Sequence, residues 1–115
     1  MEYKLKFEKT VTQEDLDNII DSAVAWCAYW CDLLEIGKRP MEDIKAMSEV
    51  VTRGGTLVFH IDEPFEDGGK KRFVLTAPKM VKALKKYGEF DFEDFDGPMS
   101  DSVLQIALFG EVVYG

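Results

Sequence analysis

The chain has 115 residues, of which 46% are hydrophobic and 31% charged, with a net charge of −8. This length and composition indicate one folded domain with a buried core and exclude a disordered chain. No apolar run approaches the roughly 20 residues of a membrane-spanning helix, and no signal-peptide pattern opens the sequence. We therefore expect a cytoplasmic protein with no membrane partner.

Alternating apolar and polar residues predict a first strand over residues 3–7. Residues 12–34 are predicted to form one long amphipathic helix, because apolar residues recur at the spacing of one helical face. Thr12 is a suitable N-cap with Asp15 three residues later, and Gly37 is a suitable stop.

The second half of this helix carries another apolar stripe, formed by Trp26, Tyr29 and Leu33. A helix that is apolar on both sides is buried on both sides. We therefore expect the rest of the domain or a second subunit to cover this stripe, and a homodimer is the favoured assembly. An aromatic platform for a planar ligand is the alternative interpretation.

The rest of the chain alternates between helix and strand. Residues 56–76 are predicted to form a β-hairpin with a long loop. The other predicted elements are a short helix from Pro40 to about Val51, a helix over about 78–87, a loop over 89–99, a short helix capped by Ser100 or Asp101 and a strand over 111–114. This order, β-α-(α)-β-β-α-α-β, predicts a single α+β domain over residues 1–115, with helices on one face of a small, mostly antiparallel sheet.

Three segments resemble a group of small uncharacterised proteins of bacteriophages and mobile elements of Firmicutes. They are Tyr29-Trp30-Cys31, Arg53-Gly54-Gly55-Thr56-Leu57 and the closing segment over 104–115. The resemblance implies a location in the cytoplasm of a bacterial host cell. It also implies a protein that binds and blocks a host component, such as part of a host defence.

The charges are unevenly distributed. Residues 70–86 carry seven of the 14 basic residues and no acidic residue. The turn Arg53-Gly54-Gly55 places backbone N–H groups beside a cation, which suits an anion, although the two glycines also permit a tight entry into a strand. We predict a site for a small anionic ligand, such as a nucleotide, formed by Arg53, Gly54, Gly55, Trp26, Tyr29, Lys70, Lys71 and Arg72.

An acidic segment with interspersed phenylalanines follows the basic one, and it is the second candidate surface. Its acidic side chains imitate nucleic acid and suit a basic host protein, while its phenylalanines suit hydrophobic anchoring. The predicted partner-binding residues are Phe90, Asp91, Phe92, Glu93, Asp94 and Phe95. The alternatives are that this loop neutralises the basic segment or that its phenylalanines only fix it to the domain. Nucleic acid is not an expected partner, because the net charge opposes it.

No catalytic motif stands out in the sequence. His60 and Asp62 leave the same face of a predicted strand, so a general base held by a carboxylate is the enzymatic alternative. Cys27, Cys31 and the single histidine do not complete a zinc site, so we expect buried free thiols, no metal and no cofactor. The leading hypothesis is a non-enzymatic module that sequesters or blocks a host component.

Overall fold

The computed structural model of the protein describes residues 2–4, 10–61, 69–88 and 96–114. Three strands, β3 (Leu33–Ile36), β4 (Leu57–His60) and β5 (Arg72–Leu75), form an antiparallel sheet with β4 at its centre. In β4 both faces are covered, since Leu57, Val58 and Phe59 are all buried. The hairpin predicted over 56–76 is confirmed in its two strands, and residues 62–68 of its loop lie outside the described part.

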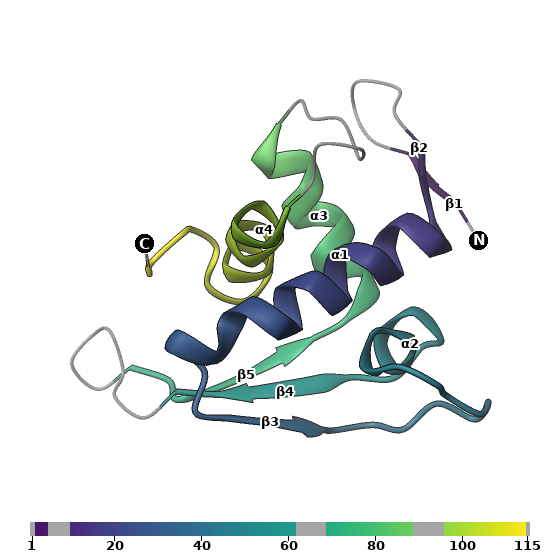
Figure 1. The fold of residues 1–115 in the computed structure, drawn as a ribbon, viewed down its shortest axis with the longest axis horizontal. Helices are drawn as coiled ribbons and strands as arrows, with labels where there is room; N and C mark the ends of the chain where they lie inside the picture. Colours follow the sequence, from purple (N-terminus) through teal and green to yellow (C-terminus); the bar gives the residue numbers. More distant parts are fainter. Residues whose placement is uncertain (1, 5–9, 62–68, 89–95, 115) are drawn as a thin grey trace.

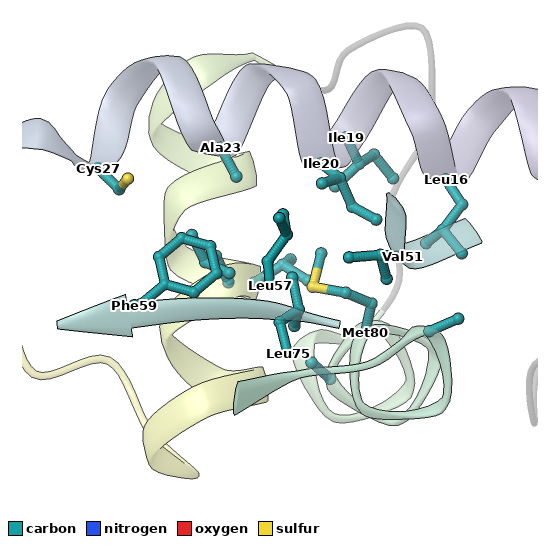
Figure 2. Packing of buried hydrophobic residues seen from close by; sticks show 14 of the residues in the cluster. Leu16, Ile19, Ile20, Ala23, Cys27, Val51, Leu57, Phe59, Leu75 and Met80 are labelled. Atoms are coloured by element: carbon teal, nitrogen blue, oxygen red, sulfur yellow. The ribbon is translucent and has the colours of Figure 1, made fainter. Parts of the chain in front are cut away.

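Three helices lie on one side of this sheet (Figure 1): α1 (Gln13–Trp26), α3 (Ala77–Tyr87) and α4 (Gly97–Phe109). The α+β class predicted from the sequence is therefore confirmed. The side chains of Leu16, Ile20 and Ala23 point from α1 toward Phe59 and Met80 (Figure 2). Burying each large aliphatic side chain stabilises the fold by roughly 1.5–3 kcal/mol. No helix within the described ranges is long and apolar enough to cross a membrane.

The long helix predicted over residues 12–34 ends earlier than expected. After Trp26 the chain makes one turn of 3₁₀ helix, η1 (Cys27–Tyr29), and then turns into β3. The prediction was wrong for Leu33 and Leu34, which belong to the strand. Their apolar spacing fits a helix and a strand equally well, and pairing with β4 decides between them.

Gly37 is a packing residue of the sheet rather than a helix stop. A Cβ atom at this position would collide with the Thr56 and Val58 side chains, and the Gly37 amide bonds to the Thr56 carbonyl. The short helix predicted from Pro40 is confined to α2 (Met47–Thr52). Its first amide groups are partly satisfied from outside, because the Ser48 N–H donates to the Asp21 carboxylate of α1 at 3.2 Å.

The N-terminal strands form a separate sheet of their own, in which β1 (Glu2–Lys4) pairs antiparallel with β2 (Thr10–Thr12). The strand predicted over 3–7 is confirmed at residues 3 and 4, and residues 5–9 lie outside the description. Thr12 and Asp15 form the predicted capping box, with reciprocal hydrogen bonds of 3.1 and 3.3 Å.

The C-terminal part differs from the prediction at both ends. α4 starts at Gly97, because the Asp96 side chain caps the Met99 amide at 2.9 Å. Ser100 and Asp101 therefore lie inside the helix and do not cap it. Residues 111–114 form no strand, since the amides of Val113 and Tyr114 bond to a side chain of α4 instead of a neighbouring strand.

Candidate functional site

A surface pocket of about 390 Å³ lies where the end of α1 meets the start of α4 and the last described residues of the chain. Trp26 is 50% exposed and Tyr29 is 57% exposed, so two large aromatic side chains face solvent here. The residues lining this aromatic pocket are Trp26, Tyr29, Pro98, Asp101, Ser102, Val112 and Tyr114. The described lining includes an acid but no basic side chain, although the sequence had placed Trp26 and Tyr29 in a site for an anion.

Gly97 determines where the Trp26 ring lies. A Cβ atom at this glycine would overlap the indole ring of Trp26, so the ring rests directly on the backbone of the first turn of α4. Any larger residue at this position would push the indole outward. The close contact between α1 and α4 therefore depends on the absence of a side chain at Gly97.

A buried carboxylate forms the floor of the aromatic pocket. Asp101 is only 4% exposed, yet it lines the pocket. Its two oxygens accept hydrogen bonds from the Tyr29 hydroxyl at 2.5 Å, from Trp30 Nε1 at 2.7 Å and from Gln105 Nε2 at 3.0 Å. Three donors on one carboxylate satisfy the buried acid and fix the orientation of both aromatic side chains.

The hydroxyl of Tyr29 remains a donor over a wide pH range. Burial raises the pKa of Tyr29 to about 12, and the hydrogen bond to Asp101 and the charge of that carboxylate act in the same direction. A deprotonated phenol would place a second negative charge against Asp101. The neutral phenol is therefore the form that the folded protein favours.

Gln105 connects this network to the end of the chain. Its side chain is completely buried, and its Oε1 accepts the amides of Val113 at 2.8 Å and Tyr114 at 2.7 Å. Its Nε2 donates to the Tyr114 carbonyl at 3.0 Å. One amide side chain thus holds the segment that supplies Val112 and Tyr114 to the aromatic pocket.

A second cavity, the lysine groove, lies between α3 and the C-terminal half of α4 and has a volume of about 330 Å³. The ammonium of Lys79 donates to the Val74 carbonyl at 2.6 Å, and that of Lys86 donates to the Gly110 carbonyl. The residues lining the groove are Lys79, Lys82, Ala83, Lys86, Ile106, Ala107 and Gly110. Three cations thus border an apolar floor, and no described lining residue is acidic.

Arg53 is engaged within its own region. Its guanidinium bonds to Glu49 at 2.8 Å and also pairs with Glu42. Gly54 has a positive φ of 97°, and a Cβ atom at Gly55 would collide with the carbonyls of Lys38 and Val50. The two glycines are therefore required by the backbone conformation and by close packing. The Arg53 guanidinium already has two carboxylate partners.

The structure separates the residues predicted to form one anion site. Arg53 precedes β4, whereas Arg72 pairs with His60 at the other end of that strand. Lys70, Lys71 and Arg72 are exposed. None of the basic residues predicted for this site lines the aromatic pocket that holds Trp26 and Tyr29.

His60 has a different carboxylate neighbour from the one predicted. Its Nε2 lies 2.7 Å from Glu35 Oε1 across the β3–β4 pair, as an exposed cross-strand contact. Asp62, the predicted partner, lies outside the described residues. A histidine and a glutamate on neighbouring strands form a common surface pair, and this contact by itself indicates no chemistry.

The two cysteines are free thiols in contact with each other. Cys27 is buried as predicted, whereas Cys31 is only half-buried. The hydrogen bond from Cys27 lowers the pKa of Cys31 to about 7, while the same contact raises the pKa of Cys27. Cys31 is therefore the more reactive thiol.

This difference predicts selective alkylation. At pH 7 we expect iodoacetamide to modify Cys31 well before Cys27, because only the Cys31 thiolate is substantially populated. Replacement of Cys27 by alanine should slow the reaction of Cys31 several-fold, since the stabilising hydrogen bond is lost. Mass spectrometry of the alkylated protein measures both rates. Equal rates for the two cysteines in the native protein would contradict the prediction.

All six residues of the predicted acidic surface lie outside the described residues: Phe90, Asp91, Phe92, Glu93, Asp94 and Phe95. Among the residues that the structure describes, no group of three or more His, Cys, Asp or Glu side chains is arranged to hold a metal ion.

Comparisons of the chain with protein-family models, curated proteins and solved structures found no match.

Proposed function

We propose that the protein is a non-enzymatic binding module that sequesters a small anionic ligand in the lysine groove. The observation that carries this proposal is the convergence of Lys79, Lys82 and Lys86 on one cavity between α3 and α4. The resemblance to phage and mobile-element proteins supplies the biological setting, in which removing an anionic host signal such as a nucleotide blocks a host response.

The lysines of the groove are favourably arranged for a phosphate-bearing ligand. Lys79 and Lys86 are each held by a backbone carbonyl, which reduces the entropy lost when they bind a ligand. An ammonium has three donors, so one bond to a carbonyl leaves others for an anion. Lys82 lies between them on the same side of α3 and is exposed.

The floor and size of the groove favour a small molecule with an apolar or planar part. Ala83, Ile106 and Ala107 provide apolar contacts beside the cations. A volume of about 330 Å³ lies within the usual range for small-ligand pockets. The net charge of −8 disfavours a long polyanion, which would approach the acidic remainder of the protein.

The three lysines of this site belong to the basic segment 70–86, but they are not the residues that the sequence predicted to bind the anion. Arg53 already has two carboxylate partners, and Arg72 lies at the far end of β4 from it. The lysine groove needs neither of them. It brings three cations together within one helix, since Lys79, Lys82 and Lys86 are three and four residues apart.

Reversal of the central charge tests this proposal. We expect Lys82→Glu to weaken binding of ATP, a cyclic dinucleotide or pyrophosphate by about tenfold or more, because an attractive charge becomes a repulsive one. Isothermal titration calorimetry at low salt measures the affinities, and added salt should weaken them further.

Lys85→Glu is the matched control, because Lys85 is on the same helix, is exposed and does not line the groove. It makes the same change in net charge and should reduce affinity much less. His60→Ala should leave binding unchanged. The proposal fails if no anion of the panel binds at low salt, or if the two lysine reversals have equal effects.

The homodimer remains a prediction. The domain leaves Trp26, Tyr29 and Leu33 about half exposed, at 50%, 57% and 53%. Exposed apolar side chains of this size are consistent with a protein contact, and a dimer through Trp26 and Tyr29 is the alternative to a small ligand at these two residues. Anion binding in the lysine groove does not depend on it, since none of the three residues lines that groove.

A further inference from the structure

We infer that the aromatic pocket is a second binding site, one that takes a methylated or quaternary ammonium group. The inference combines three features of the pocket: aromatic rings at its walls, a buried carboxylate at its floor, and a described lining without a basic side chain. It is independent of the function proposed for the lysine groove.

The rings suit a cation. Trp26, Tyr29 and Tyr114 come from three separate segments and line the same cavity. The negative face of an aromatic ring attracts a cation, most strongly in tryptophan. Tyr114 is held in place by stacking on Trp30, with ring centroids 5.7 Å apart and planes 2° from parallel.

Asp101 adds a negative charge beneath the rings. It accepts bonds from Tyr29, Trp30 and Gln105, which is the acceptor-only pattern of an ionised carboxylate. These three partners are neutral donors, so none of them compensates the negative charge. A cation entering the pocket gains the attraction of this charge in surroundings that water screens only partly.

The aromatic pocket should bind a methylated ammonium group more tightly than a primary ammonium group. A primary ammonium must keep its N–H groups hydrogen-bonded, whereas the carboxylate oxygens here already serve three donors. A quaternary group has no donor to satisfy, and its methyl groups pack against apolar surface. Pro98 and Val112 provide such surface at the pocket wall.

The two proposed sites are structurally separable. Both use α4, but Asp101 and Ser102 line the aromatic pocket, whereas Ile106 and Ala107 line the lysine groove. No described lining residue is common to both. A change in one site is therefore a control for the other, and failure of either proposal leaves the other standing.

The test compares choline with 3,3-dimethylbutan-1-ol, its neutral isostere of nearly equal shape. Each is titrated into the intact protein while the indole N–H signals of Trp26 and Trp30 are followed by NMR. We expect choline to shift the Trp26 signal and to bind roughly tenfold more tightly than the isostere, because only choline carries the charge. A peptide with trimethyllysine and its unmethylated form are titrated in parallel. If the methylated peptide binds more tightly than choline, the ammonium group that the pocket takes belongs to a protein side chain. If choline binds more tightly, it belongs to a small molecule.

Variants locate the binding. Trp26→Leu should abolish the choline response, whereas Leu33→Ala should preserve it, since Leu33 is equally exposed but does not line the pocket. Asp101→Asn should reduce the preference for choline over the isostere, because the rings still attract the cation but the negative charge beneath them is lost; if this variant does not fold, the isostere comparison in the native protein still decides. The inference is overturned by equal affinity for choline and its isostere, or by no response to any ammonium ligand. It is also overturned if light scattering shows a dimer that Trp26→Leu dissociates, because a second copy then fills the pocket.

Discussion

Replacing Trp30 with alanine is expected to lower the free energy of unfolding by about 3–5 kcal/mol, the usual cost of removing a large aromatic residue from a core. Trp30 is 5% exposed, and its ring lies against Phe59 at 6.1 Å, Phe109 at 5.4 Å and Tyr114 at 5.7 Å between centroids. Its Nε1 also donates to the buried Asp101. The substitution leaves a cavity and removes a donor from a buried carboxylate.

Urea denaturation measures this loss, and Trp26→Ala is the matched control. Trp26 is the same residue type four positions earlier but is half exposed, so its replacement should cost about 1 kcal/mol or less. Trp30→Phe should fall between the two, because it keeps most of the packing and loses the N–H. Equal destabilisation by the two alanine variants would show that Trp30 is not the central aromatic residue of the core.

Replacing Gln105 with alanine is expected to cost about 2–4 kcal/mol and to release the end of the chain. The change empties a fully buried position and leaves the amides of Val113 and Tyr114 without their acceptor. Because Val112 and Tyr114 line the aromatic pocket, the variant should also lose the response to choline. Anion binding in the lysine groove should persist under conditions where the variant remains folded.

Hydrogen exchange locates the effect. In the native protein the amides of Val113 and Tyr114 should exchange slowly, and in Gln105→Ala they should exchange at nearly the rate of an unstructured peptide. Ser102→Ala, a change one turn earlier on the same helix, should leave this protection intact. If both amides stay protected in Gln105→Ala, the side chain of Gln105 is not what holds the segment.

Elements whose signals are local could be predicted from the sequence alone. The i, i+3, i+4 spacing of Leu16, Ile19, Ile20 and Ala23 predicted the buried face of α1, and Thr12 caps this helix as expected. The hairpin of β4 and β5 followed from two short apolar runs around a turn. Periodicity and capping depend on residues a few positions apart, so they can be read directly from the chain.

Features that depend on residues far apart in the sequence could not be predicted in this way. Leu33 and Leu34 belong to β3 because they pair with β4, although the sequence pattern placed them at the end of a helix. Arg53 was predicted to bind an anion, but its guanidinium pairs with the carboxylates of Glu42 and Glu49. Asp101 appeared in the sequence as a helix cap, yet it bonds to Tyr29 and Trp30, more than 70 positions away. A buried polar group needs a hydrogen-bond partner, and the fold can supply that partner from any part of the chain. Residue spacing along the chain therefore does not predict which partner it will be.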